Sequence, residues 1–374
     1  MTKILKIVII AEAALIAVCL VLTIVFSVVK ASAPATASAS ESDKTASASI
    51  DQSASESADT GLADGEYEND EYKYVVWGAN CTITKYLGNS EEVTVPEKIE
   101  NKTVTEIGVT AFQNNTFIKK LTLPDTITKI CDSAFTSCIN LESINIPDGV
   151  TSINGGVFSN CQKLKSIAIP GGVTSINGYA FISCFDLTEV TLNNDLVSIG
   201  NCAFTNCISL TEITVPDSVT SIGDGAFGQC EKLETVNLGG GLTEIGEGVF
   251  LNCFKLKSIT LPDGVTSIGK LTFQDCRVLE TVNLSRSLKT IGDSAFSFCF
   301  ALKSITIPAN VTYIGPNAFQ ACTNLSSVTF ENTVGWFSVK YPANNAMDVT
   351  DASQNATVMK DVLADFEFVR SDGE

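Results

Sequence analysis

The feature that most constrains this chain is a repeat of 23 residues, which runs from about residue 93 to residue 330. A representative copy is LTEITVPDSVTSIGDGAFGQCEK, at residues 210–232. Phe recurs at every step, and in every copy after the first a Cys follows it three residues later. A fixed period of this length is typical of stacked units that bury their apolar side only against their neighbours. The sequence therefore predicts a solenoid.

Local periods within one copy predict its elements. Ile213 lies in an alternating run typical of a short strand, which Pro216 ends because it has no N–H to donate. Gly223 occupies a slot that holds Gly or Asn in nine of the ten copies, which predicts a left-handed turn residue. The i, i+3 spacing of Phe227 and Cys230 predicts a helical turn. Together these elements predict an α/β-type repeat solenoid, a leucine-rich-repeat arc with a parallel sheet on the concave side and short helical turns on the other.

The unit LxxIxIPxxVTSIGxxAFxxC resembles the BspA-like leucine-rich repeat, which occurs in surface and secreted proteins of bacteria and some protists. The resemblance extends from about residue 72 to the C-terminus. It implies adhesion to host proteins, to other cells or to extracellular-matrix components.

The later copies, from Pro170 onward, also alternate in pairs. One residue type follows the strand in one copy and another in the next: Pro216, Pro262 and Pro308 alternate with Asn193, Gly239 and Ser285. This pattern suggests the duplication of a 46-residue pair of units.

The N-terminal residues 1–30 predict a membrane anchor. Lys3 and Lys6 precede an apolar run over residues 7–29, which exceeds the ~20 residues that a membrane span requires. The basic residues before the run place the N-terminus in the cytoplasm. A cleaved secretory signal remains the alternative, because Ala31-Ser32-Ala33 and Ala35-Thr36-Ala37 both resemble A-x-A cleavage sites. Either way, the remainder is exported, to the cell surface or as a secreted protein.

The composition divides the rest of the chain. Residues 31–65 are rich in Ser and Ala without apolar periodicity, and predict a disordered tether. Residues 66–110 predict an N-terminal cap and the entry to the first repeat, with Trp77 and Tyr74 covering the open end.

The repeats themselves occupy residues 111–330, and residues 331–374 lose the period and predict a C-terminal cap. In that cap, Trp336 begins a predicted strand, and Lys360–Phe366 is expected to form a short closing element.

The recurring Cys residues form a single file, one per copy. A single file cannot surround a tetrahedral metal ion, and no C-x-x-C pair occurs in the chain. We therefore expect these thiols to be reduced, buried packing groups. Cys81, Cys131 and Cys202 lie outside the file, and their redox state stays open.

Two sets of residues are candidates for binding a partner. The first should point outward from the strands: Thr191, Thr214, Asn237, Thr260, Asn283 and Thr306. The second occupies the slot after the Cys, and either forms apolar spots on one flank or packs under the next unit: Ile139, Phe185, Ile208, Phe254 and Phe300.

The sequence gives little support for catalysis. The chain contains no His, and its Asp residues occupy slots where Asp is ordinary in turns. A net charge of −18 makes nucleic acid a poor partner. We expect no enzyme activity, metal or cofactor. The predicted function is non-catalytic adhesion or protein–protein recognition at the cell surface, through an extracellular protein or glycan. A carbohydrate-binding module and a structural spacer are the alternatives.

Overall fold

The computed structural model describes residues 62–340, 343–346, 349–360 and 367–370. The predicted anchor and most of the predicted tether lie outside these ranges. Among the helices of the described residues, none is long and apolar enough to cross a membrane.

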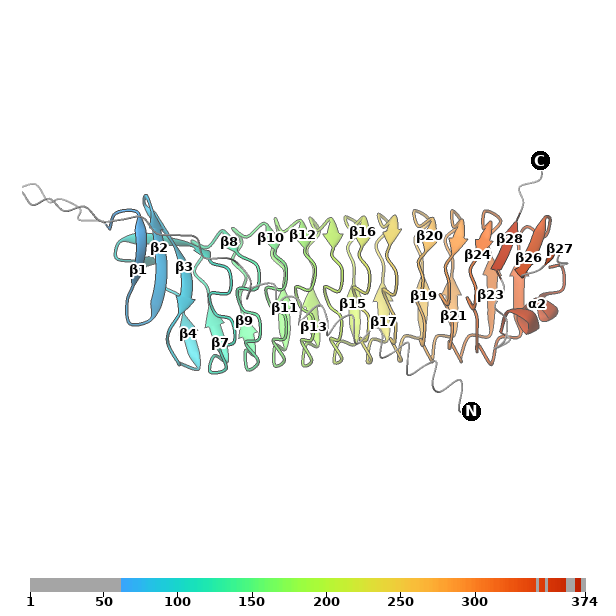
Figure 1. Ribbon diagram of the computed structural model, residues 1–374, viewed down its shortest axis with the longest axis horizontal. Helices are drawn as coiled ribbons and strands as arrows, with labels where there is room; N and C mark the ends of the chain where they lie inside the picture. Colours follow the sequence, from blue (N-terminus) through green and yellow to red (C-terminus); the bar gives the residue numbers. More distant parts are fainter. Residues whose placement is uncertain (1–61, 341–342, 347–348, 361–366, 371–374) are drawn as a thin grey trace, which may run out of the picture. The chain divides into compact units, whose positions relative to one another are not determined.

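Each unit of the solenoid is one rung with two short strands. In a central rung these are β15 (Glu212–Thr214) and β16 (Ser221–Ile222), followed by a turn segment over residues 223–230. The strands pair in parallel with those of the next rung at a register of 23 residues, so that Ile213 lies beside Val236. Figure 1 shows successive rungs side by side.

The strands form two ladders along the solenoid. The first ladder contains β4 (Glu92–Thr94), β7 (Lys120–Thr122), β9 (Ser143–Ile144), β11 (Ser166–Ala168), β13 (Glu189–Thr191), β15, β17 (Thr235–Asn237), β19 (Ser258–Thr260), β21 (Thr281–Asn283), β23 (Ser304–Ile307) and β25 (Ser327–Phe330). The second contains β8 (Lys129–Ile130), β10 (Ser152–Ile153), β12 (Ser175–Ile176), β14 (Ser198–Ile199), β16, β18 (Glu244–Ile245), β20 (Ser267–Ile268), β22 (Thr290–Ile291) and β24 (Tyr313–Ile314).

After its first three strands, the first ladder is interrupted every second rung. It divides into β4-β7-β9, β11-β13, β15-β17, β19-β21 and β23-β25. In each of the four pairs the earlier strand belongs to a rung with Pro, such as Pro216. The preceding Val215 N–H reaches forward to Asn237 O at 2.8 Å. In a parallel strand the N–H of the following residue would point toward the preceding rung. That residue is Pro216, which has no N–H. The 46-residue alternation of the sequence therefore appears as paired rungs.

The core is a column of stacked Phe rings, one per rung, from Phe112 to Phe319. Neighbouring ring centroids lie 5.1 Å to 5.8 Å apart, as for Phe181–Phe204 and Phe227–Phe250. Every ring of the column is at most 2% exposed. Tyr86 extends the stack at its N-terminal end. Because aromatic burial is the largest apolar contribution available to a rung, this column holds the solenoid together.

The predicted helical turns are wrong. In the described ranges one α-helix forms, and it lies outside the rungs. Within a turn segment, every second N–H bonds three residues back, as Cys230 N–H does to Phe227 O. The N–H groups between them bond to the next rung, as Phe227 N–H does to Val249 O at 2.9 Å. Gly225 and Gln229 have φ of 62° and 60°, which interrupts a right-handed helix.

The left-handed residue predicted at Gly223 is also misplaced. Positive φ occurs at Gly225 and Gln229 and at the matching positions of all other rungs, but not at Gly223. Gly is needed at Gly223 because a Cβ would lie 2.6 Å from Asn201 N of the preceding rung. At Gly223 itself, the close approach of two backbones therefore leaves no room for a Cβ.

The N-terminal cap is a sheet of β1 (Gly65–Glu68), β2 (Tyr72–Trp77) and β3 (Asn80–Tyr86), followed by β6 (Lys102–Ile107) and β5 (Lys98–Ile99). Tyr74 is buried as expected, at 3% exposed. Trp77 does not cover the first rung, because alternation along β2 turns it to solvent, where it is 44% exposed. Its indole N–H donates to Thr82 Oγ1 at 3.2 Å.

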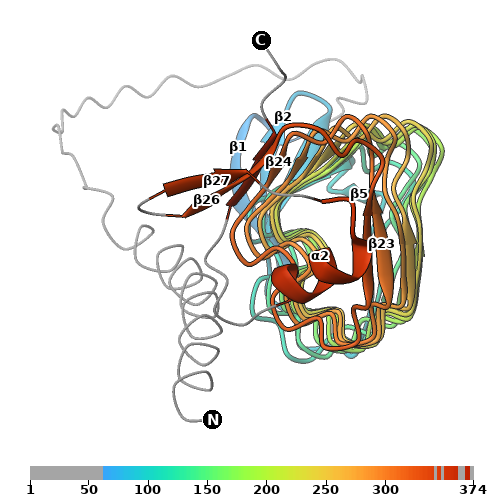
Figure 2. The same cartoon turned by 90° about the vertical axis from the view of Figure 1, so that its right-hand side faces the viewer.

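The C-terminal end carries β26 (Trp336–Lys340), β27 (Ala343–Ala346), α2 (Ala352–Met359) and β28 (Glu367–Arg370). The predicted strand at Trp336 is confirmed. β28 pairs antiparallel with β24, and the Asn355 amide of α2 donates to Val328 O at 3.0 Å. Figure 2 shows α2 lying across the last rung. Most of the predicted closing element, residues 361–366, lies outside the described residues.

Candidate functional site

The outward strand positions form a polar face on the first ladder. All six candidates are exposed: Thr191, Thr214, Asn237, Thr260, Asn283 and Thr306. Some of their hydrogen-bonding capacity is used between rungs, because Asn283 Nδ2 donates to Thr260 Oγ1 at 2.9 Å. The face therefore offers a flat row of hydroxyl and amide groups without a large side chain to anchor a partner. Their role in binding stays a prediction.

The slot after the Cys forms a flank of half-buried apolar side chains, namely Ile139, Phe185, Ile208, Phe254 and Phe300. Neither alternative describes them fully, since each side chain is partly covered and partly accessible. Arg277 lies over the Phe254 ring at 4.2 Å. Its guanidinium also donates to both carboxylate oxygens of Asp275, at 2.9 Å each. Phe300 meets Phe298 edge to face at 6.2 Å. The flank thus combines aromatic rings with one cation.

The file of Cys residues is structural. The nine thiols are buried and free, and each lies within hydrogen-bond range of a Phe carbonyl in the preceding rung. Cys230 Sγ donates to Phe204 O at 3.3 Å. Burial raises the pKa of the Cys230 thiol to about 12. A thiol that stays protonated is a poor nucleophile and a poor metal ligand, so these residues pack the core as predicted.

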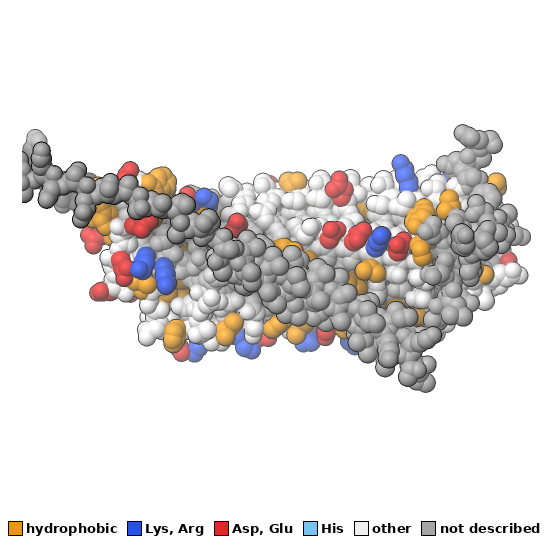
Figure 3. All heavy atoms as spheres, viewed as in Figure 1, with side chains coloured by type: hydrophobic (Ala, Val, Ile, Leu, Met, Phe, Trp, Pro, Cys, Tyr) orange, Lys and Arg blue, Asp and Glu red, His pale blue; other side chains and the backbone are white. Residues whose placement is uncertain are grey.

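Charged side chains lie mainly at the corners of the rungs. Glu280 and Lys303, one rung apart, pair at 2.9 Å along one edge. In Figure 3, acidic, basic and apolar side chains follow one another along the lower edge. Such exposed pairs contribute ~0–1 kcal/mol each. In the part of the chain that the structure describes, no three metal-ligating side chains are grouped to hold an ion.

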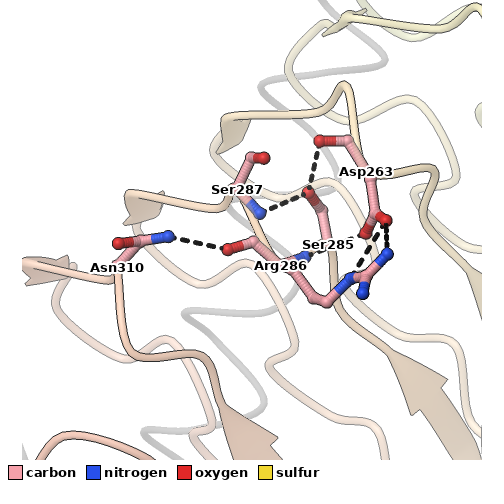
Figure 4. A network of polar contacts seen from close by, with 5 residues as sticks. All are labelled: Asp263, Ser285, Arg286, Ser287 and Asn310. Carbon is pink, nitrogen blue, oxygen red and sulfur yellow. Dashed lines mark hydrogen bonds and ion pairs between the residues drawn. The ribbon is translucent and has the colours of Figure 1, made fainter.

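A polar network closes one corner of the solenoid. Arg286 pairs with the carboxylate of Asp263 in the preceding rung, and Ser285 Oγ donates to Asp263 O at 3.2 Å (Figure 4). In turn, Asn310 Nδ2 donates to Arg286 O at 2.9 Å. The hydrogen bonds from Arg286 lower the pKa of Asp263. The carboxylate is engaged in tying rungs together, so this corner is structural.

The sequence interpretation missed a hollow at the first rung, between the end of β3 and residues 110–117. Its volume is about 430 Å³, and Lys85, Gln113 and Phe117 are among its lining residues. A signal was present in the sequence, because the first copy has Asn115 where the other nine have Cys. The departure marks a rung whose surroundings differ from those of the others.

The comparisons with known proteins agree with this architecture. The BspA type leucine-rich repeat region matches the chain at residues 86–210, 175–277 and 243–347, with 6 copies. A leucine-rich repeat protein from Bacteroides ovatus is 27% identical, with a TM-score of 0.42, over 70% of this chain and 88% of that one.

Two further crystal structures have lower identity. The pneumococcal vaccine antigen PcpA is 22% identical, with a TM-score of 0.52, over 74% of this chain and 84% of that one. A leucine-rich cell surface protein from Faecalibacterium prausnitzii is 24% identical, with a TM-score of 0.36, over 73% and 96% of the two chains. No curated protein matches. From the repeat match, the chain belongs to the BspA-type leucine-rich repeat family, whose members are generally non-catalytic and bind other proteins.

Proposed function

We propose that the chain is a cell-surface protein that uses its rungs to bind an extracellular protein and so mediates adhesion. Residues 1–30 support export, because a basic start precedes an apolar run of membrane-spanning length. The segment either anchors the repeats outside the cell or is removed on secretion. The repeat then serves as a rigid support that presents the same positions many times over.

The observation that carries the proposal is the flank of half-buried apolar side chains. Aromatic residues and Arg dominate the binding energy of protein interfaces, and the flank offers Phe185, Phe254 and Phe300 together with Arg277. A partly covered ring loses little conformational freedom on binding, because its rung already restrains it. The polar face of the first ladder lacks such anchors, so we assign it to the periphery of the contact.

The test is binding of the full-length protein in detergent micelles to a panel of extracellular-matrix proteins. We expect saturable binding to one of them, weakened at least tenfold in the triple variant Phe185→Ser, Phe254→Ser and Phe300→Ser. The matched control is Val197→Ser, since Val197 is 45% exposed and lies outside the flank. An unchanged circular dichroism spectrum shows that each variant is folded.

The location of the repeats is tested separately, by adding a protease to intact cells that produce the full-length chain. We expect loss of the repeats from the cell without lysis, or their recovery from the medium after cleavage of the signal. Repeats protected until the cells are lysed would contradict display outside the cell. Saturable binding to none of the panel proteins would favour the structural spacer.

A further inference from the structure

The hollow at the first rung arises where the solenoid has no complete preceding rung. In each of the nine later rungs, the carbonyl of the residue after the column Phe accepts an N–H from the rung before it. Asn206 N–H bonds to Gly228 O at 2.8 Å in this way. The corresponding residue of the first rung is Gln113, and in the described part of the chain no hydrogen bond to Gln113 O is formed. Within the described ranges, the first rung therefore presents a ladder acceptor that has no donor.

The chain turns away just before it would cover this acceptor. Tyr86 N–H bonds to Ala111 O at 2.8 Å, as a preceding rung would. In a later rung the N–H two residues farther on bonds to the equivalent acceptor, as Asn114 N–H does to Thr136 O, and the residue at that position here is Gly88. The intervening Leu87 N–H bonds to Glu71 O in the cap at 2.8 Å, and among the described residues no bond from Gly88 N–H to Gln113 O is formed. β3 thus supplies only half of a preceding rung, and the missing half leaves the hollow.

The wall of the hollow carries an exposed aromatic ring. Phe117 is 53% exposed. It occupies a slot that holds a polar residue in most later rungs, such as Asn140 and Lys232. The side chain of Asn115 accepts the N–H of Phe117 at 2.9 Å and so fixes the turn that presents the ring. A Cys at this position would instead point into the core, as in the other copies.

The charge of the hollow is opposite to that of the chain. Among the described residues, Lys85 is the only charged one that lines the hollow, although the chain carries a net charge of −18. Its register partner on β2 is Lys73, whose ammonium is held by Glu68 at 2.8 Å. In the described residues no ion pair forms to Lys85.

We propose that this hollow binds a carboxylate-bearing sugar, a hexuronic acid unit of a polysaccharide. Lys85 pairs with the carboxylate, and a sugar hydroxyl donates to Gln113 O. The Phe117 ring packs against the C–H face of the pyranose. Thr84, Thr110 and Asn114 line the same space and offer hydroxyl and amide groups to the remaining hydroxyls. A volume of about 430 Å³ is of the size of small-ligand sites and holds one or two sugar rings.

The test is calorimetric titration of the full-length protein in detergent micelles with digalacturonic acid, and with neutral digalactose as the matched probe. We expect the acidic disaccharide to bind at least tenfold more tightly, with an affinity that falls as salt is raised. Lys85→Gln and Phe117→Ser should each weaken its binding at least fivefold. Lys232→Gln, which removes an exposed Lys from the slot equivalent to Phe117, should leave it unchanged.

Equal binding of the acidic and neutral disaccharides, or no binding of either, would overturn the proposal. So would a Lys85→Gln variant that binds as the unchanged protein does. A short acidic peptide that displaces the sugar with equal affinity would assign the hollow to peptides instead. Within the described part of the chain, the hollow shares no residue with the flank. The triple Ser variant of the flank should therefore bind digalacturonic acid as tightly as the unchanged protein does.

Discussion

A central rung and the first rung have the same elements but different surroundings. Around Phe227, ring stacking, backbone N–H groups and the Cys230 thiol are all engaged by the rungs on either side. At the first rung, a Tyr replaces one Phe neighbour, Asn115 replaces the Cys, and Gln113 O has no N–H donor among the described residues. Stacking therefore saturates the interior of a solenoid and leaves binding capacity at its ends and on its sides.

The largest effect that would test this comparison is removal of an interior ring. Phe204→Ala should lower the free energy of unfolding by about 3–5 kcal/mol, because it opens a cavity between two stacked neighbours. Phe117→Ala, at the first rung, should cost less than ~1 kcal/mol, since this ring is already 53% exposed. Urea denaturation followed by circular dichroism measures both. Equal losses would mean that the first rung is packed as tightly as the interior.

The next effect separates two glycines of one turn segment. Gly223→Ala should cost more than ~2 kcal/mol, because its Cβ would meet backbone 2.6 Å away. Gly225→Ala should cost only about 1 kcal/mol, since the strain lies in its φ of 62° and the nearest atom to its Cβ, Cys202 Sγ, is 3.3 Å away. Thermal unfolding of the two variants gives the order. A larger loss of stability in Gly225→Ala than in Gly223→Ala would contradict close approach as the reason for Gly at position 223.

A pH-dependent effect is expected from the buried thiols. Burial raises the pKa of Cys230 from its ordinary value of 9.0 to about 12. The unfolded chain therefore loses this proton first, so the thiol's contribution to stability is complete below about pH 9 and declines between about pH 9 and 12.

Urea denaturation at several pH values in this range gives the free energy of unfolding as a function of pH. This free energy should fall less steeply with pH in Cys230→Ala than in the unchanged protein, by at most the slope that one released proton contributes. At pH 8, iodoacetamide should alkylate the half-buried Cys131 before Cys230 in the folded protein. Alkylation of Cys230 at the same rate as Cys131 would show that the column opens readily.

The sequence was sufficient for the parts of the fold that depend on side-chain period. The 23-residue recurrence of Phe and Cys placed the column, and Pro216 correctly marked the end of a strand. The turn segments were misjudged because i, i+3 spacing is shared by helices and by consecutive hydrogen-bonded turns. Similarly, the preference for Gly at Gly223 has two physical causes, positive φ and close approach, which composition alone does not separate.

For the candidate sites too, the sequence predicts what depends on side-chain period and misses what depends on the path of the backbone. Alternation correctly turned Thr214 and its equivalents outward, and it would also have turned Trp77 outward had the register of β2 been known. Asn115 in place of Cys marked the first rung as different, but the residue pattern did not show the hollow itself, because its acceptor, Gln113 O, belongs to the backbone. Whether a carbonyl has a donor depends on where the neighbouring chain runs, and a pattern of residue types does not encode that.

The most direct measurement of the contrast between rungs is amide hydrogen exchange of the full-length protein, resolved by peptide mass spectrometry. We expect the turn segment 223–230 to exchange near the rate of global unfolding. Residues 110–117 should exchange faster, because only half a rung covers them. Equal protection of the two segments would contradict the claim that the first rung is open.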